Sequence, residues 1–502
     1  MSAGEAALGR SARRSSTSLR PRAASRRTAF WYKASPSSLA ASRRVVLISV
    51  SVQSARVENI VVIGGVAAGL SAASRARKLA PRAQITVLER GAQAAYSACG
   101  LPYYLARRVP SLEALRVHPA DWFRERRQLD LRLGCEAVEI EPARRRVLAR
   151  SAQGARWINY DRLVIATGTR SRWEPETKLR NVFAANTWDQ VQTLEAALQT
   201  GALQRIAVVG GGYIGLETAE ALAQRGLHVA LVHAHEQVLR GFDPDLVADL
   251  PGRLAALGIE LHLGTRVEGL EGAQGGRVLG LQSASEMIAC DAVINCGGLQ
   301  PEVTLAQAAG IALGRTGAIA VDERQQTSLP GVFAAGDCAE TRQQVTGAAA
   351  WVPLGAPANK QGRIAGANAV NAPAARFPGV LATLAVPLAG QEYGRTGLSL
   401  EQARTAGFDA AVEEVTGSSK AGYLDAQPVT VRIVYQPSTG RLLGAHFRGA
   451  PGTVAGRLDT AAAALTARMS LEQVEHLDLV YSPDIAPLYE ALLIAAHNAR
   501  KT

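Results

Sequence analysis

The first regular pattern of hydrophobic and polar residues in the chain spans residues 60–88, where two short apolar runs flank a segment of mixed character. Residues 60–63 (IVVI) and 85–88 (ITVL) are almost wholly apolar, whereas residues 70–80 (LSAASRARKLA) mix small and charged side chains. A short apolar run bounded by turn residues is typical of a buried strand, and the longer mixed segment favours a helix. The pattern predicts a strand–helix–strand unit over residues 60–88.

The same pattern returns 146 residues later, counted from Gly64 to Gly210. Its runs are IAVV (206–209), LETAEALAQRG (216–226) and VALV (229–232). Two more strand-like runs, LVIATG and VFAAGD, end at Gly168 and Asp337. Strands that alternate with helices predict a parallel sheet, so we expect an α/β fold with two Rossmann-like dinucleotide-binding domains.

Glycine-rich turns join the first strand of each unit to its helix. They read Gly64-Gly65-Val66-Ala67-Ala68-Gly69 and Gly210-Gly211-Gly212-Tyr213-Ile214-Gly215. Such turns let the backbone and a helix N-terminus approach a pyrophosphate, while an acid at the end of the second strand holds a ribose hydroxyl. Glu89 has that place in the first unit, and His233 has it in the second. Val66 departs from the strict fingerprint, which has glycine there.

Two such units in one chain predict two dinucleotides. FAD with a nicotinamide cofactor is the economical pair, because hydride passes readily between a flavin and a nicotinamide. Near the C-terminus, the strand-like segments VTVRIVY (429–435) and LLGAHFRG (442–449) flank PSTG, which is a hairpin signal. At about 150 residues per domain, the length of 502 residues suggests about three domains.

The charge of the chain is concentrated at one end. The formal net charge is +12, but residues 1–57 carry ten Arg, one Lys and one Glu, a net of +10, and the remaining 445 residues are close to neutral. Three interpretations of the basic segment stay open: a reading frame started too far upstream, an organellar transit peptide, or an arm that binds nucleic acid or a membrane. The near-neutral body argues against a nucleic-acid partner.

The localisation that we expect is cytoplasmic, or organellar only if the basic segment is a genuine transit peptide. No apolar run reaches the length of about 18 residues that a membrane-spanning helix needs, so no membrane partner is expected. Five Cys in so long a chain are no disulfide framework and fit a reducing compartment.

One of the five cysteines stands where redox chemistry is expected. Cys99 follows the first strand–helix–strand unit and precedes a predicted helix, and a thiol at a helix N-terminus has a lowered pKa that makes thiolate available. Cys135, in the alternating segment LRLGCEAVEI, is expected in the core. Cys290 and Cys296 have neither redox nor zinc spacing, so no metal site is predicted, and Cys338 is expected to pack beneath the flavin.

These motifs carry a family resemblance. GGVAAG, SACGLPYYL, ATGT, GGGYIG, AAGDCAE and WVPLGAPANKQGR occur in the order found in pyridine nucleotide–disulfide oxidoreductases. More narrowly, residues 58–502 resemble the single-cysteine branch: coenzyme A-disulfide reductases and the related NAD(P)H oxidases and peroxidases. The two-cysteine CxxxxC pattern is excluded because Tyr104 stands five residues after Cys99, and HPTxxE is also absent. His446, His476 and His497 are therefore expected to be surface or satisfied histidines.

The resemblance implies an FAD-dependent NAD(P)H oxidoreductase that reduces a small-thiol disulfide, with coenzyme A disulfide as the main expectation. It implies a homodimer in which Tyr423 and Tyr481 of one subunit assist Cys99 of the other. Tyr213 would cover the flavin, and Glu217 would orient the nicotinamide. The candidate contacts with coenzyme A phosphates are Arg75, Lys78, Asn359, Lys360 and Arg363.

Three alternatives stay open: an NAD(P)H oxidase that reduces dioxygen, a polysulfide or persulfide reductase, and a flavin-containing electron-carrier partner without a thiol role. Two departures bear on them. Ala95 and Ala98 stand where related reductases often have Ser and Asn, and Val66 to Ala68 lack the His of peroxidases. His233 would not repel the 2′-phosphate of NADPH, although no Arg is seen to bind it, so NADPH or dual use is the expectation.

The predicted domains are a flavin domain at 58–168 and 297–376, a nicotinamide domain at 169–296, and a C-terminal α+β dimerisation domain at 377–502. The predicted cofactor-binding residues are Gly64, Gly65, Ala67, Gly69, Glu89, Arg90, Thr167, Gly168, Gly336 and Asp337 toward the flavin, and Gly210, Gly212, Tyr213, Ile214, Gly215, Glu217, His233 and Gly297 toward the nicotinamide.

Overall fold

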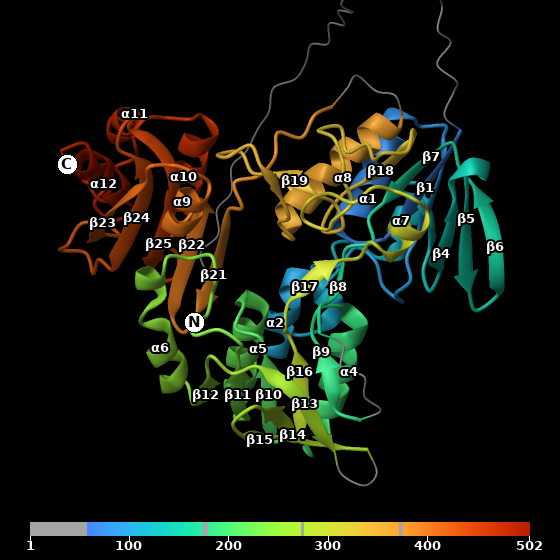
Figure 1. Cartoon of the computed structure of the whole chain (residues 1–502), viewed down its shortest axis with the longest axis horizontal. Coiled ribbons are helices and arrows are strands. Elements are labelled where there is room, and N and C mark those ends of the chain that lie inside the picture. The colour runs from blue at the N-terminus through green and yellow to red at the C-terminus, as the bar shows by residue number, and fades with distance from the viewer. Residues whose placement is uncertain (1–57, 174–178, 273–275, 371–374, 502) are drawn as a thin grey trace, which may run out of the picture. The chain divides into compact units, whose positions relative to one another are not determined.

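A computed structural model describes residues 58–173, 179–272, 276–370 and 375–501. The basic segment at residues 1–57 lies outside the described residues, as does part of the predicted junction between the flavin and C-terminal domains. Figure 1 labels the helices and strands.

The first dinucleotide-binding unit is the centre of a five-stranded sheet whose neighbouring strands are all parallel. In sheet order its strands are β18 (Val332–Ala334), β7 (Arg162–Ile165), β1 (Asn59–Ile63), β2 (Gln84–Leu88) and β3 (Asp130–Arg132). β18 comes from a segment far along the chain, so this sheet is built from two separate stretches of sequence. β1 and β7 are almost wholly buried, as their continuous apolar runs predict.

Helices α1 (Ala67–Leu79) and α8 (Gly355–Ala369) lie side by side at this sheet (Figure 1). Their backbones touch: a Cβ on Gly362 would collide with the carbonyl of Ala68, and one on Gly366 with the carbonyl of Ala72. The small residues of both helices therefore serve packing. This contact holds the C-terminal part of the flavin half against the first glycine turn.

The segment LRLGCEAVEI, expected to be one alternating strand, is two strands in two sheets. It breaks at Gly134, whose φ of +58° is a left-handed conformation, so that β3 ends in the parallel sheet and β4 (Glu136–Glu141) begins another. β4 pairs antiparallel with β5 (Arg146–Ser151), which pairs with β6 (Gly154–Asn159). Cys135, between β3 and β4, is buried as predicted. The short helices nearby are α2 (Leu101–Leu105), α3 (Ala120–Glu125) and α7 (Thr304–Ala308).

The second unit repeats the arrangement of the first. Its parallel sheet has the order β12 (Ile259–His262), β11 (His228–Val232), β10 (Arg205–Val209), β16 (Ala292–Asn295) and β9 (Val182–Ala184). Its helices are α4 (Trp188–Gln199), α5 (Tyr213–Ala223) and α6 (Leu250–Ala256). An antiparallel sheet of β13 (Val267–Gly272), β14 (Val278–Ser283) and β15 (Met287–Ala289) adjoins it.

The two chain crossings between the two units pair with each other. β8 (Thr169–Ser171), on the way into the second unit, forms an antiparallel ribbon with β17 (Leu299–Pro301), on the way out. Asn295 holds the base of this ribbon, because its side-chain amide donates to the Ser171 hydroxyl at 2.8 Å and to the Trp173 carbonyl.

The C-terminal region has an antiparallel sheet covered by helices. In sheet order the strands are β21 (Leu384–Leu388), β22 (Gln391–Gly397), β25 (Arg441–Gly449), β24 (Pro428–Gln436) and β23 (Ala411–Ser418). The predicted PSTG hairpin joins β24 to β25. The helices are α9 (Leu400–Thr405), α10 (Ala455–Thr466), α11 (Leu471–Glu475) and α12 (Ala491–Ala499), and the short pair β19 (Thr341–Arg342) and β20 (Ala349–Ala350) precedes the region.

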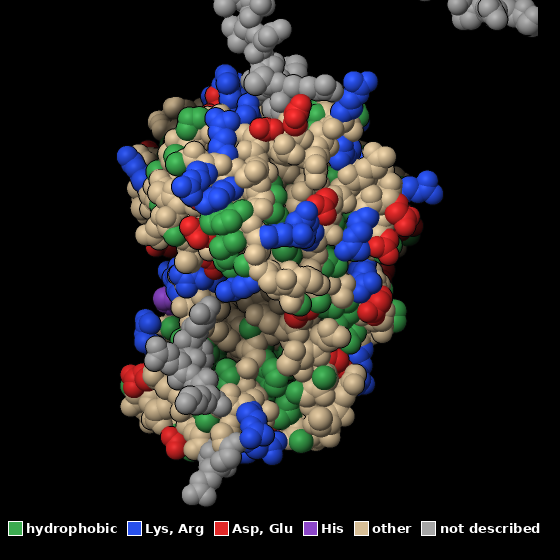
Figure 2. Space-filling view, turned by 90° about the vertical axis from the view of Figure 1, so that its right-hand side faces the viewer, with side chains coloured by type: hydrophobic (Ala, Val, Ile, Leu, Met, Phe, Trp, Pro, Cys, Tyr) green, Lys and Arg blue, Asp and Glu red, His purple; other side chains and the backbone are tan. Residues whose placement is uncertain are grey.

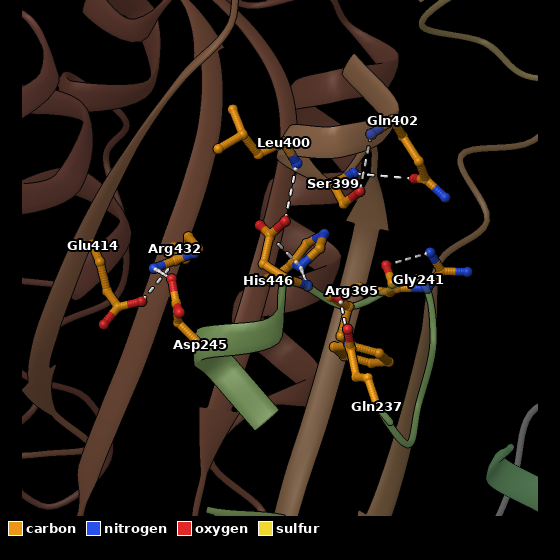
Figure 3. Close-up of polar contacts among 12 residues, drawn as sticks. Gln237, Gly241, Asp245, Arg395, Ser399, Leu400, Gln402, Glu414, Arg432 and His446 are labelled. Atoms are coloured by element: carbon orange, nitrogen blue, oxygen red, sulfur yellow. Dashed lines mark hydrogen bonds and ion pairs between the residues drawn. The ribbon is translucent and has the colours of Figure 1, made fainter. Parts of the chain in front are cut away.

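A polar junction joins β22 and β25 to the loop after β11 (Figure 3). His446 is fully buried there, and its Nδ1 accepts a hydrogen bond from the Asp243 backbone N–H at 3.3 Å. Nε2 of His446 has no partner among the described residues. His446 is therefore not a surface histidine, and it is satisfied at Nδ1 only, because β25, which reads as an ordinary strand, is covered by the loop after β11.

Charged side chains of both signs are interspersed on the face shown in Figure 2. This agrees with the 44 basic and 42 acidic residues of positions 58–502. None of the helices that the structure describes is long and apolar enough to cross a membrane. The α/β fold class with two Rossmann-like domains and an α+β C-terminal domain is confirmed.

Candidate functional site

One cavity of about 920 Å³ collects residues from both dinucleotide-binding units. The carboxyl ends of β1, β2, β7 and β18 line it, together with the starts of α1, α2, α5 and α8. Ligands of open α/β sheets bind at this end of the strands. The cavity therefore lies where a dinucleotide is expected.

The first glycine turn is shaped for close approach. Gly64 has a φ of +107°, and a Cβ there would collide with the Ala166 carbonyl; a Cβ on Gly69 would collide with the Gly64 carbonyl. No side chain caps the N-terminus of α1. Its first backbone N–H groups are therefore available to a pyrophosphate, which the helix dipole also favours.

Glu89, at the end of β2, is held against this turn. Its Oε2 accepts the Gly65 N–H at 2.6 Å and its Oε1 accepts the Gly91 N–H at 2.7 Å. Burial raises the pKa of Glu89, although both hydrogen bonds oppose the shift. Glu89 thus presents a fixed acceptor at the place where the family motif puts a ribose.

Asp337 lies just beyond the carboxyl end of β18. Burial raises its pKa to about 6, and its buried Oδ1 has no partner among the described residues. The flanking backbone is fixed, because Gly336 N–H donates to Gln361 at 3.0 Å and the Trp351 indole donates to the Asp337 carbonyl at 2.7 Å. An acceptor left without a partner in a cavity wall fits a ligand hydrogen bond. Together with the glycine turn and Glu89, it fits FAD.

Cys99 opens into the same cavity, from a short 3-10 turn (Ala98–Gly100) directly before α2. Its side chain is free, like those of the other four cysteines. The expected lowering of its pKa is wrong: burial, followed by the Glu217 and Asp337 carboxylates, raises the pKa of Cys99. The helix that follows Cys99 has only five residues, so its dipole is small. The two acids act on the thiol from distant segments of the chain, and the local sequence does not reveal them.

The second unit reaches the cavity through the start of α5. Tyr213, Ile214 and Glu217 line it. Burial raises the pKa of Tyr213 to about 12, and its hydroxyl lies 3.5 Å from the Pro353 carbonyl before α8. Burial and then the neighbouring Glu220 raise the pKa of Glu217 to about 7. A carboxyl that titrates near neutrality therefore lies beside Cys99.

The second glycine turn has the backbone of the first. Gly210 has a φ of +113°, and a Cβ on Gly215 would collide with the Gly210 carbonyl. The His233 ring packs against Gly211, where a Cβ would be 2.8 Å from the ring. In the loop after β11, Arg240 Nη1 lies 2.8 Å from His235 Nε2.

Some predicted site residues do not line the cavity. Gly69, Gly210, Gly212, Gly215, His233 and Gly297 lie outside its lining, as do all of the suggested coenzyme A contacts, Arg75, Lys78, Asn359, Lys360 and Arg363. Asn359 instead donates to the Ser71 hydroxyl between α8 and α1. Cys338 is buried behind the wall, with its Sγ 3.5 Å from the Ile165 and Ala335 carbonyls, which confirms its packing role.

Tyr423 and Tyr481 are also outside the lining. They are 77% and 51% exposed, on the C-terminal region. Within one chain, then, the structure joins Cys99 to both nucleotide units but not to either tyrosine.

Sequence reasoning missed several lining residues. Tyr103 follows Cys99 by one helical turn, and Arg150, Asn186 and Glu302 come from β5, the loop before α4 and the end of the β17 segment. Of these residues, only Tyr103 could have been predicted from the sequence, because it belongs to the motif SACGLPYYL around Cys99. The others reach the cavity through chain crossings that no local pattern marks.

Comparison with known proteins agrees with this geometry. The family model described as pyridine nucleotide-disulphide oxidoreductase matches residues 58–351, and the model of the family's dimerisation domain matches residues 385–490. The chain belongs to this family. As a member, it is a flavin-dependent NAD(P)H oxidoreductase that uses FAD, and its dimerisation domain supports a homodimer.

Three matches illustrate the range of relatives. The NAD(P)H sulfur oxidoreductase (CoA-dependent) of Pyrococcus abyssi is 34% identical over 444 residues, 88% of this chain and 97% of that protein. An NADH oxidase of Methanocaldococcus jannaschii is 29% identical over 446 residues, covering 88% and 98%. The structure of an NAD-dependent persulfide reductase from A. fulgidus has a TM-score of 0.84 and 32% identity, covering 88% of this chain and 82% of that chain.

Proposed function

We propose that this oxidoreductase uses electrons from NAD(P)H to reduce the disulfide of a small thiol, coenzyme A disulfide in the first place, through Cys99. The observation that carries the proposal is the position of Cys99. It opens into the cavity whose other walls are the flavin turn at Gly64 and Gly65 and the nicotinamide-side carboxyl of Glu217. Such an arrangement suits electron transfer from the nicotinamide to a sulfur by way of the flavin.

FAD, when bound, supplies the two-electron relay between the nicotinamide and sulfur. The residues of the chain do the rest. Cys99 thiolate attacks one sulfur of the substrate RSSR, the S–S bond breaks, and the leaving RS⁻ takes a proton. Two electrons from NAD(P)H then cleave the Cys99–SR bond, so that NAD(P)H and one H⁺ convert one RSSR into two RSH.

The proton that the leaving thiolate takes has two candidate sources. Glu217 has a pKa of about 7, so it exchanges a proton at neutral pH, and its protonation also removes a charge that disfavours the Cys99 thiolate. The second candidate is the pair Tyr423 and Tyr481 from a second copy of the chain. Their exposure on the dimerisation domain supports a role across the dimer.

A second acceptor is favoured by a specific observation. The relatives at 34% and 32% identity are named for sulfur and persulfide reduction, and the first of them for dependence on coenzyme A. Attack of Cys99 on a polysulfide or persulfide uses the same steps, with hydrosulfide in place of one thiol. Coenzyme A disulfide, polysulfide and dioxygen are therefore the three acceptors to compare.

The test is Cys99→Ser, with Cys296→Ser as the matched control. We expect Cys99→Ser to retain anaerobic bleaching of the flavin by NAD(P)H but to lose reduction of the disulfide by more than about 10³-fold, as removal of a covalent nucleophile does. Unchanged disulfide turnover in Cys99→Ser would refute the proposal. Turnover with dioxygen alone, at full rate in the wild type, would assign the enzyme as an oxidase.

Mixed dimers test the tyrosines. Chains with Cys99→Ser are combined with chains that carry Tyr423→Phe and Tyr481→Phe, each inactive as a homodimer. If the tyrosines act across the dimer, one intact site forms in each mixed dimer and activity returns to about half of the wild-type value per dimer. Activity that does not return contradicts the role in trans.

A further inference from the structure

The short helix that follows Cys99 packs on the nicotinamide unit. Leu101 and Leu105 of α2 are fully buried, in the same apolar cluster as residues of α4 and α5. Figure 1 shows α2 next to α5. The clusters that the described residues form at the parallel sheet of the flavin unit contain neither leucine. The redox cysteine therefore precedes a helix whose core contacts lie in the other unit.

The turn that carries Cys99 is held to the same cluster. The Ser97 backbone N–H donates to the Leu115 carbonyl at 2.8 Å, and a Cβ on Gly100 would lie 2.4 Å from the Leu115 side chain. Leu115 is itself buried in the cluster that contains residues of α4 and α5. Contacts on both sides of Cys99 thus lead into the nicotinamide unit.

A buried ion pair holds the far end of α2. Arg225, just after α5, donates through both branches of its guanidinium to the Glu195 carboxylate of α4, from Nη1 at 2.5 Å and from Nη2 at 3.1 Å. Nη1 also donates to the carbonyl of Leu105, the last residue of α2, at 3.3 Å. The last carbonyls of a helix have no partner within it, so this contact satisfies a group that α2 leaves open. One guanidinium therefore joins three helices.

The free energy of folding alone does not explain this pair. The side chains of Arg225 and Glu195 are only 7% and 10% exposed, and removing both charges from water is so costly that apolar residues of similar volume often stabilise a core equally well. A bidentate contact adds orientation, because it holds the planar guanidinium in one direction. That orientation determines where α2 ends relative to α5, the helix that carries Glu217.

We propose that Arg225 and Glu195 are positioning residues that hold the helix after Cys99 on the nicotinamide unit and so fix the thiol beside Glu217. Cys99 and Glu217 line the same cavity, one just before α2 and the other on α5. Because both helices meet at the Arg225 guanidinium, release of α2 would let the thiol move away from this carboxyl. The inference rests on Cys99 being the reacting thiol, as proposed above, and adds the residues that set its place.

The test replaces the ion pair by apolar residues of similar size. The double variant Glu195→Met/Arg225→Met leaves no unpaired buried charge, so it should fold and retain FAD. We expect kcat for disulfide reduction to fall at least about tenfold, because a small misplacement of a reacting atom has an effect of that order. Anaerobic reduction of the flavin by NAD(P)H should keep its wild-type rate.

Alkylation of Cys99 is a readout that a merely structural role would not move. Burial and then the Glu217 carboxylate raise the pKa of Cys99 in the intact site. A thiol that moves away from Glu217 loses part of this shift, and its reaction with iodoacetamide at neutral pH then becomes about threefold faster for each unit by which the pKa falls. Rates over a series of pH values, followed by mass spectrometry of the Cys99 peptide, measure the change. We therefore expect alkylation to become faster while disulfide turnover becomes slower.

Two further variants control for charge and folding. Glu141→Met/Arg146→Met removes an ion pair between β4 and β5 that lies outside the cavity lining, and should leave both measurements unchanged. Arg225→Lys keeps the charge but not the planar fork, so it should shift both measurements in the expected directions by smaller factors.

The two measurements also determine what would contradict the proposal. A wild-type alkylation profile in Glu195→Met/Arg225→Met, whether turnover is kept or lost, would overturn it. If that variant does not fold, wild-type values of both measurements in Arg225→Lys would overturn it. Alkylation needs no acceptor, so the shift can be found even if Cys99→Ser refutes the disulfide proposal, and its absence leaves the Cys99→Ser test as it stands.

Discussion

The two strand–helix–strand units share one backbone and end in opposite chemistry. Gly64 and Gly210 have nearly the same left-handed φ, +107° and +113°. Gly69 and Gly215 each meet the carbonyl of the first glycine of their own turn so closely that a Cβ would not fit. The first and last glycines are therefore the steric requirement common to both units.

The third position of the turn shows what the motif does not require. Val66 has a φ of −112°, which any residue adopts. Gly212 has a φ of −81°, and a Cβ there would meet no heavy atom within 4 Å. The departure of Val66 from the strict fingerprint thus has no conformational consequence, since the backbone has a negative φ at this position in both units.

The residues at the ends of the second strands differ between the two units. Glu89 is buried and fixed by two backbone N–H groups, whereas His233 packs its ring on the equivalent glycine and stands beside His235, which is in contact with Arg240. One backbone thus carries a buried carboxylate at this place in one unit and an imidazole ring in the other. The comparison teaches that the glycine turn fixes a backbone shape common to both units, whereas the residue at the end of the second strand is free to differ.

The largest expected effect comes from the last glycine of each turn. Gly69→Val should cost about 4 kcal/mol or more, because the new side chain collides with backbone, and the protein should purify without flavin absorbance. Gly215→Val should keep flavin but fail to be reduced by NAD(P)H. Gly252→Ala, at a glycine of α6 where a Cβ would meet no heavy atom within 4 Å, is the control and should change neither property. If Gly215→Val loses flavin first, the two turns are not independent.

The second effect distinguishes Glu89 from His233. Glu89→Ala leaves the N–H groups of Gly65 and Gly91 without their acceptor, so we expect a loss of about 2–4 kcal/mol in the free energy of unfolding. His233→Ala removes packing on Gly211 and one hydrogen bond to the Gln237 backbone, and should cost about 1 kcal/mol. Urea titration of both variants measures the difference. Equal losses would mean that the carboxylate has no special structural role.

The smallest effect concerns Glu217, the acid that the second unit places in the cavity of the first. Its pKa in the folded protein, about 7, is above the ordinary value of 4.5. The unfolded chain therefore releases this proton first, and the contribution of Glu217 to stability falls as pH rises from about 4.5 to 7. Allowing for partial exposure, Glu217→Gln should gain about 2 kcal/mol over wild type between pH 5 and pH 8.

Urea unfolding of the flavin-free protein at a series of pH values measures this gain. Glu268→Gln, at an exposed acid of β13, is the control and should show no such trend. A gain that is the same at pH 5 and pH 8 would show that Glu217 ionises normally when the protein is folded.

Local patterns predicted most of the elements that carry the site. The runs at 60–63 and 85–88 are β1 and β2 within a residue, and PSTG is the turn between β24 and β25. The segment LRLGCEAVEI was misjudged, because a left-handed Gly134 sends its two halves into different sheets. Periodicity measures which face of a strand is buried and carries no information on which sheet the strand joins.

The site was predicted in its parts and not in its assembly. The glycine turns, Glu89, Asp337 and Cys99 were found from spacing, since each depends on a short stretch of chain with a definite backbone shape. The contact between Arg240 and His235 was not predicted from the sequence. It lies in a loop that contains the left-handed Leu239 and is hydrogen-bonded to β22 and to the start of α9. Burial of His446 likewise depends on a loop more than 200 residues away in sequence.

The sequence by itself determined two Rossmann-like units, a cysteine after the first of them that belongs to no CxxxxC pair, and a C-terminal module, since these follow from local backbone geometry and residue spacing. The tertiary structure decided the electrostatics. It partly buried Cys99 and placed the carboxylates of Glu217 and Asp337 near it, and both effects raise the pKa of Cys99. The local sequence had predicted a lowered pKa. The tertiary structure also put Arg240 beside His235. Charges act through space at short range, and which charges become neighbours is settled only when distant segments pack.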